Sequence, residues 1–167
     1  MGKRSDFARV ERDFYPTPYA GVVPLLPHLK AGTKFHEPCY GRGHLADHLE
    51  KNGHHCAEWG DISNGIDALS LTECGGACFI TNPPWNRKIL HPLIEHLSNI
   101  VPTWLLFDAD WPHTLQARPF MPRLRKIVSV GRLIWIPGTK MTGKDNCAWY
   151  LFTEPQNRPT KFDGRMQ

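Results

Sequence analysis

Residues 75–86 of the chain read GGACFITNPPWN, an apolar run that leads into two prolines and a tryptophan. The run at 75–81 is short and apolar enough to be a strand in the middle of a parallel sheet. A proline cannot donate a hydrogen bond to a neighbouring strand, so this strand must end at Asn82. Each proline also fixes its own φ near about −65°, and Pro84 restricts Pro83 in addition. The stretch therefore predicts a rigid, extended turn at the end of a central strand.

The side chains of this turn suit a planar, polar ring. Asn82 offers hydrogen-bond donors and an acceptor, and Trp85 offers a flat face. A proline-rich loop whose tryptophan fills the core is the alternative interpretation. The position of the turn at the end of a central strand favours ligand binding.

Outward from this stretch, strand and helix patterns alternate. Two further segments rich in β-formers lie on either side of PGTKMTGKD (137–145) and predict a hairpin with a basic, glycine-containing tip. The pattern predicts an α/β fold: a doubly wound, mostly parallel sheet with a C-terminal antiparallel hairpin. We expect strands at 33–39, 54–62, 75–81, 103–111, 125–136 and 146–152, and helices at 15–29 (capped by Thr17, with Pro18 first), 44–53 and 87–100.

The 167 residues are enough for one domain with a core of its own. We expect a flexible basic segment at 1–14 and a single domain at 15–167. A composition of 41% hydrophobic and 22% charged residues is that of a globular protein, and no transmembrane helix or secretory signal is expected. The five irregularly spaced cysteines favour free thiols in a reducing compartment, so we expect a cytoplasmic protein.

Polar and glycine residues also follow the other strands, where ligands bind in open α/β sheets. Gly41 and Gly43 allow a tight turn and a close approach of the backbone to a ligand. Asp61 lies twenty positions after Gly41, a spacing suited to the hydroxyl groups of a ribose. Asp67 follows in a second short loop. An ordinary glycine turn with solvated carboxylates is the alternative for each feature alone.

The nine histidines and five cysteines show no zinc-binding spacing, so no metal is expected. The sequence DADW at 108–111 either borders a site or merely ends a strand, and we favour the second interpretation. Several basic side chains either contact the phosphates of a nucleic acid or simply form a solvated face, and the sequence favours neither interpretation. The candidates for such contacts are Arg87, Lys88, Arg118, Arg123, Lys140 and Lys144.

Five segments in this order resemble one family. They are DFYPTPYAGVVPLL (13–26), EPCYGRGHLADHL (37–49), GDIS (60–63), GIDAL (65–69) and ITNPPWN (80–86). Together they resemble the S-adenosylmethionine-dependent N6-adenine DNA methyltransferases, and the compact size is similar to that of phage and prophage members. The resemblance spans about half of the chain. It departs from the family at Trp85, where Tyr or Phe is commoner, and in the lack of a separate target-recognition domain.

The resemblance implies a Rossmann-like domain of the class I methyltransferase type, with S-adenosylmethionine as cofactor and DNA as partner. It implies a location in the cytoplasm, that of the host if the protein is phage-encoded. It also implies roles for individual residues. The catalytic motif would be Asn82, Pro83, Pro84 and Trp85. The cofactor would be bound by Tyr15, Pro16, Thr17, Pro18, Glu37, Pro38, Cys39, Gly41, Gly43, Asp61, Asp67 and Asn82.

In this interpretation, the Asn82 side-chain oxygen and the Pro83 carbonyl accept the two N–H groups of the target amine. The target adenine is flipped out of its strand and stacks on Trp85. Three alternatives remain: the same reaction on RNA, methylation of a protein glutamine at N5, and a non-catalytic module that binds nucleic acid or the cofactor. The recognition sequence and the oligomeric state stay open.

Overall fold

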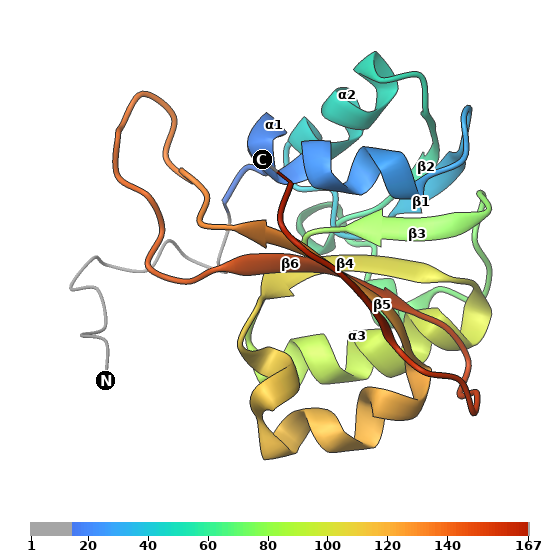
Figure 1. Ribbon diagram of the computed structural model, residues 1–167. Coiled ribbons are helices and arrows are strands. Elements are labelled where there is room, and N and C mark those ends of the chain that lie inside the picture. The colour runs from blue at the N-terminus through green and yellow to red at the C-terminus, as the bar shows by residue number, and fades with distance from the viewer. Residues whose placement is uncertain (1–14, 167) are drawn as a thin grey trace.

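The computed structural model describes residues 15–166 and contains a single sheet of seven strands in the order β2-β1-β3-β4-β6-β5-β7 (Figure 1). Strands β1 to β4 are parallel, β6 is antiparallel to both β4 and β5, and β7 is parallel to β5. The predicted α/β sheet with an antiparallel C-terminal pair is confirmed. The strands are β1 Lys34–Glu37, β2 His55–Trp59, β3 Cys78–Thr81, β4 Thr103–Asp108, β5 Leu124–Gly131, β6 Cys147–Phe152 and β7 Lys161–Asp163.

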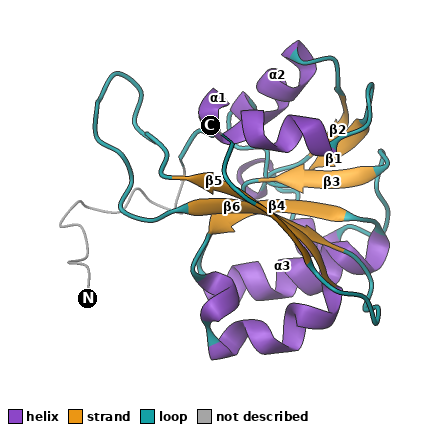
Figure 2. Cartoon of the chain, viewed as in Figure 1, coloured by secondary structure: helices purple, strands orange, loops and turns teal. Residues whose placement is uncertain are grey.

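Helices cover both faces of the sheet (Figure 2), as expected for a doubly wound fold. Helices α1 and α2 lie over one face, and α3 and η6 lie over the other. The α-helices are α1 Tyr19–Val22, α2 His44–Lys51 and α3 Arg87–Ile100. The 3-10 helices are η2 Val23–His28, η3 Ile62–Asn64, η4 Ala68–Ser70, η5 Trp111–His113 and η6 Leu115–Arg123.

The central strands β3 and β4 explain the apolar runs in the sequence. All four residues of β3 are buried, and so are the first five residues of β4. Neighbouring residues of β4 point to opposite faces, so Leu106 packs in the core under α2 while Leu105 packs against α3. Burial on both faces removes the polar alternation that a half-exposed strand would show.

The helix predicted at 15–29 is only partly correct. Regular helix begins at Tyr19, and its N-terminal cap is Pro18 in an extended conformation, not Thr17. After one turn the chain continues as the 3-10 helix η2. Pro24 and Pro27 lie in that segment and lack the N–H groups that a continuous α-helix would use.

The C-terminal hairpin is also corrected. Strand β5 ends at Gly131, which has a φ of +90°, and not at residue 136. Residues 132–146 form a loop without regular structure that is longer than the predicted tip at 137–145. The predicted strands at 54–62 and 103–111 end earlier as well, at Trp59 and Asp108. The prediction for residues 1–14 lies outside the described residues. Within 15–166, no helix combines the length and the apolar character needed to cross a bilayer.

Candidate active site

A cleft of about 720 Å³ opens at the carboxyl ends of β1, β2 and β3. Strand β1 lies between β2 and β3, so the chain crosses from one side of β1 to the other at this point. Open α/β sheets bind ligands where the strand order reverses in this way. Most of the predicted site residues line the cleft: Tyr15, Pro16, Thr17, Glu37, Pro38, Cys39, Gly41, Asp61, Asp67, Asn82 and Pro84.

Four predicted residues are not among those that line the cleft. Pro18 caps α1, and Gly43 caps α2 in a left-handed conformation with a φ of +78°. Pro83 is buried in the turn, and Trp85 packs against both cores of the sheet. The turn at Gly43 and the side chains of the other three residues therefore shape the site from behind its wall.

The sequence reasoning missed three exposed aliphatic side chains that line the cleft. Ile62, Leu69 and Ile89 line it and remain 59%, 39% and 42% exposed. Ile62 closely follows β2, Ile89 closely follows the proline turn, and Leu69 lies two positions after the predicted site residue Asp67, which are the signals that could have identified them. Apolar walls of this kind suit the faces of a planar ring system.

Asp61 connects the two loops that follow β1 and β2. Its Oδ2 accepts a hydrogen bond from the Gly41 N–H at 2.9 Å, and its Oδ1 accepts one from the Ser63 N–H at 2.9 Å. Asp67 plays a similar local part, because its Oδ1 accepts from the Leu69 N–H at 2.9 Å. Both carboxylates are thereby fixed in the cleft wall.

Gly43 is required by the turn between β1 and α2. Its left-handed backbone disfavours any residue with a Cβ. A Cβ there would also lie 2.4 Å from the hydroxyl oxygen of Tyr40. The Tyr40 ring stacks on Trp59 with ring centroids 4.6 Å apart. The glycine thus allows Tyr40 to lie across the turn and to line the cleft.

Glu37 brings a buried carboxyl group to the cleft. Its side chain is 2% exposed, and its Oε2 has no hydrogen-bond partner among the described residues. Burial raises the pKa of Glu37 well above its usual range, although a hydrogen bond from the Ala46 backbone opposes this shift. A buried carboxyl with an open acceptor beside a cleft is suited to a positively charged group of a ligand.

Cys39 lies next to Glu37 in the cleft wall. Burial raises the pKa of its thiol to about 12. The thiol therefore stays protonated near neutral pH, and a protonated thiol is a poor nucleophile. The site is not arranged for covalent catalysis by this cysteine.

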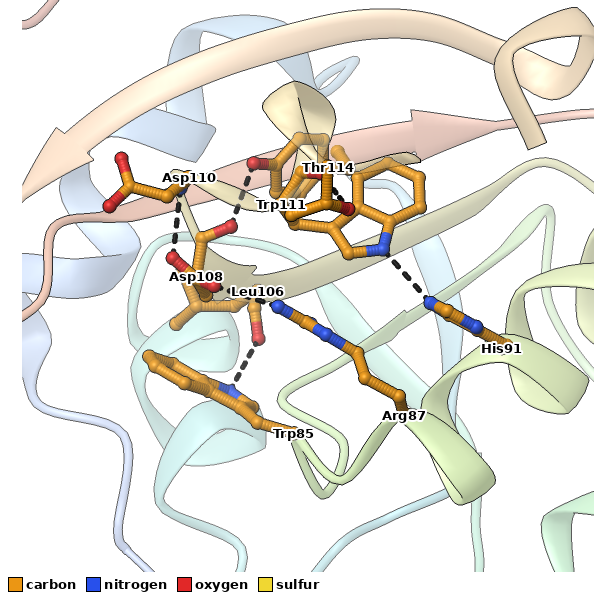
Figure 3. Close-up of polar contacts among 9 residues, drawn as sticks. Trp85, Arg87, His91, Leu106, Asp108, Asp110, Trp111 and Thr114 are labelled. Atoms are coloured by element: carbon orange, nitrogen blue, oxygen red, sulfur yellow. Dashed lines mark hydrogen bonds and ion pairs between the residues drawn. The ribbon is translucent and has the colours of Figure 1, made fainter. Parts of the chain in front are cut away.

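The Asn82 amide is held at both ends. Its Nδ2 donates to Thr17 Oγ1 at 3.2 Å, which joins the proline turn to the segment before α1. Its Oδ1 accepts from the indole Nε1 of Trp85 at 3.3 Å. The same N–H also donates to the Leu106 carbonyl at 3.2 Å, the Trp85 contact drawn in Figure 3. The Trp85 ring also meets Trp135 edge-on at 5.8 Å. The orientation of the amide is therefore set before any ligand arrives.

An ion pair fastens the end of this turn to β4. Arg87 Nη2 lies 2.7 Å from Asp108 Oδ2, and Asp108 Oδ1 accepts from the Asp110 N–H at 2.8 Å (Figure 3). The Asp108 carbonyl accepts from the Tyr150 hydroxyl at 2.9 Å. The DADW sequence thus ends β4, and its first residue holds the beginning of α3 against the sheet.

The candidate basic residues differ in their surroundings. Arg87 pairs with Asp108, and Arg123 is 11% exposed and donates to Asn99 at 2.7 Å. The other four side chains are exposed: Lys88, Arg118, Lys140 and Lys144. Among residues 15–166, no three His, Cys, Asp or Glu side chains are grouped so that they could hold a metal ion.

The mostly parallel sheet with helices on both faces and a cleft at the carboxyl ends of its strands defines a Rossmann-like α/β fold, and comparison with a solved structure supports this fold. The chain is similar to a protein from Pyrococcus horikoshii described as a candidate RNA methyltransferase, with a TM-score of 0.60 and 16% identity over 92% of this chain and 94% of the other. It is also similar to a dimethyladenosine transferase from Plasmodium falciparum, with a TM-score of 0.47 and 10% identity over 85% and 62% of the two chains. No protein-family model and no curated protein matches the sequence.

Proposed function

We propose that the chain is an S-adenosylmethionine-dependent methyltransferase that acts on the N6 amine of adenine in DNA. The observation that carries this proposal is the position of Asn82. Its amide stands at the carboxyl end of β3, beside a cleft that also holds Glu37 and Asp61. Residues 15–167 would act as one methyltransferase domain.

The residues of the cleft fit S-adenosylmethionine, whose sulfonium supplies an electrophilic methyl group. The open acceptor of Glu37 suits the ammonium group of the methionine part. Asp61, whose carboxylate is fixed in the cleft wall by the Gly41 and Ser63 N–H groups, would accept hydrogen bonds from the ribose hydroxyls. Ile62 and Leu69 offer apolar surfaces for the faces of the adenine ring, with Asp67 close to its edge.

Asn82 would act on the target amine. One lone pair of its Oδ1 is taken by the Trp85 indole, and the second can accept an N–H of adenine N6. With the Pro83 carbonyl as second acceptor, both N–H groups are held, and the nitrogen lone pair is concentrated towards the methyl group. Transfer is then a direct displacement in which positioning is the main catalytic device. The protonated Cys39 takes no part in the bond changes.

RNA is the second candidate substrate. The solved structure with a TM-score of 0.60 to this chain is described as a candidate RNA methyltransferase, and the likeness covers 92% of this chain and 94% of the other. Nothing in the cleft distinguishes deoxyribose from ribose in the target. The two substrates share the target base and the role of Asn82, so both belong in one test.

The Asn82→Ala variant tests the proposal. We expect transfer of labelled methyl groups from S-adenosylmethionine to DNA or RNA to fall by about a hundredfold or more, the loss seen when a preorganised polar group is removed from an active site. Binding of S-adenosylhomocysteine, measured by calorimetry, should remain within a few-fold of wild type. Asn52→Ala, an exposed residue at the end of α2, is the matched control. Full transfer by Asn82→Ala would contradict the role given to this amide.

A further inference from the structure

The loop at 132–146, here called the arm, lies at the catalytic edge of the sheet. It joins β5 to β6 and extends away from the body of the molecule (Figure 1). Because β5 runs parallel to β4, the arm leaves the sheet at the edge where β3 ends in the proline turn. Among the described residues, β5 and β6 are the two consecutive strands that pair with each other in antiparallel fashion, and the arm is the loop that joins them.

The base of the arm is fixed to the two segments that form the site. Leu133 is buried and packs so closely on α1 that a Cβ at Gly21 would lie 2.9 Å from it. The Gly143 N–H donates to the Leu133 carbonyl at 2.7 Å and closes the base. Trp135 contacts Trp85 at 5.8 Å and Tyr15 at 6.3 Å between ring centroids. The arm therefore begins beside the cleft in a defined position.

The outer part of the arm combines apolar and basic side chains. Ile136 is 52% exposed and Met141 is 56% exposed. Arg132, Lys140 and Lys144 are exposed as well, and Asp145 is the single acidic residue of the arm. Exposed apolar side chains between basic ones match a nucleic-acid strand, which presents phosphates along its backbone and apolar faces at its bases.

We propose that the arm binds the nucleic-acid strand next to the target adenine. Lys140 and Lys144 would contact phosphates, and Ile136 and Met141 would pack against bases left unstacked when the target enters the cleft. This inference rests on the proposed function and specifies which surface holds the substrate. In this proposal, a segment of the catalytic domain itself contacts the nucleic acid around the target adenine.

The salt dependence of binding tests the arm directly. Binding of a fluorescent oligonucleotide that contains adenine is measured by anisotropy at several salt concentrations, as duplex DNA and as single-stranded RNA. In the Lys140→Gln/Lys144→Gln variant, the slope of log affinity against log salt for the duplex should become shallower by about 1.8, or roughly 0.9 for each lost phosphate contact. Lys30→Gln/Lys51→Gln removes the same charge from exposed positions near the opposite edge of the sheet and should leave the slope almost unchanged.

A second variant separates the apolar contacts from charge. Ile136→Ser/Met141→Ser should weaken binding by a similar factor at every salt concentration, because apolar contacts release no counterions. Affinity for S-adenosylhomocysteine verifies in each case that the domain is folded. Equal slopes for the arm and control variants, with wild-type binding intact, would overturn the arm inference and leave the proposed function standing. A wild-type protein that binds the cofactor product but no nucleic acid would overturn both.

Discussion

Two hydrogen-bond partners from different segments of the chain orient the Asn82 amide. Thr17 comes from the segment before α1, and Trp85 comes from the same turn as Asn82. The sequence suggested Trp85 mainly as a stacking platform. In the structure its indole N–H is shared between the Asn82 amide and the Leu106 carbonyl. A tyrosine or phenylalanine ring has no N–H at that position, so the tryptophan gives this turn a second role as a positioning group.

The Trp85→Phe variant tests this positioning role. The ring remains, but the hydrogen bond that orients Asn82 is lost, at a cost of about 1 kcal/mol. We expect kcat for methyl transfer to fall by roughly five- to tenfold, with little change in the affinity for S-adenosylhomocysteine. Nitrogen-15 NMR of the Asn82 side-chain amide should show a shifted and less well-resolved pair of signals. Unchanged kcat and unchanged amide signals would show that Trp85 does not orient Asn82.

Glu37 links the site to pH. Burial raises the pKa of its carboxyl in the native protein above the unfolded value of about 4.5, so the native state retains a proton that the unfolded chain releases. The contribution of Glu37 to stability is therefore most favourable below the unfolded pKa and declines as pH rises towards the native pKa. In Glu37→Gln, which resembles the protonated carboxyl, this decline should be absent from urea unfolding curves recorded between about pH 5 and pH 8.

Cofactor binding should respond to the same group with the opposite sign. The ionised carboxylate is the form that attracts an ammonium group, so wild-type affinity for S-adenosylhomocysteine should increase with pH across this range. Glu37→Gln should bind more weakly and lose that pH dependence. Parallel pH profiles for the two proteins would show that Glu37 does not contact the charged end of the ligand.

At the scale of elements, the turn between β1 and α2 depends on a glycine with two constraints. Gly43 has a left-handed backbone, and the Tyr40 ring occupies the space of any Cβ. Gly65 has a similar φ of +83°, but nothing lies within 4 Å of its Cβ position. A substitution at Gly65 therefore introduces backbone strain alone, whereas a substitution at Gly43 introduces both backbone strain and a steric clash with Tyr40.

Alanine at each position gives a matched pair of variants. Gly65→Ala should lower the free energy of unfolding by about 1–2 kcal/mol through backbone strain alone. Gly43→Ala should lower it further and should also weaken binding of S-adenosylhomocysteine, because Tyr40 lines the cleft and must move. Denaturant unfolding and calorimetry provide the two measurements. Equal effects of the two substitutions would mean that the position of Tyr40 is not important.

The accuracy of the sequence-based prediction also varied by element. The central strands were found because β3 and β4 are buried on both faces and therefore read as unbroken apolar runs. The helix η6 was missed because Pro119 and Pro122 argue against helix, although a 3-10 segment accommodates them. Strand β7 has only three residues, and its pairing with β5 is a tertiary effect with no local signal.

At the scale of the whole molecule, the sheet brings distant motifs to one edge. The segments around Tyr15, Glu37, Asp61 and Asn82 meet in one cleft because each follows a parallel strand or packs beside one. The sequence motifs and the rule for α/β sheets were sufficient to predict this grouping. The basic tip at 137–145 was predicted, but the position of the arm beside the site was not, since it depends on contacts of Leu133 and Trp135 with residues fifty or more positions away.

The identity of the methylated atom tests the account most directly. Purified protein is incubated with S-adenosylmethionine and, separately, with unmethylated DNA and RNA, and the nucleosides are quantified by mass spectrometry after digestion. We predict N6-methyldeoxyadenosine in the DNA sample, with a yield lower by about a hundredfold or more from the Asn82→Ala variant. N6-methyladenosine in RNA alone would move the activity to the second candidate substrate. No methylated adenine in either sample, from protein that binds S-adenosylhomocysteine, would contradict the account.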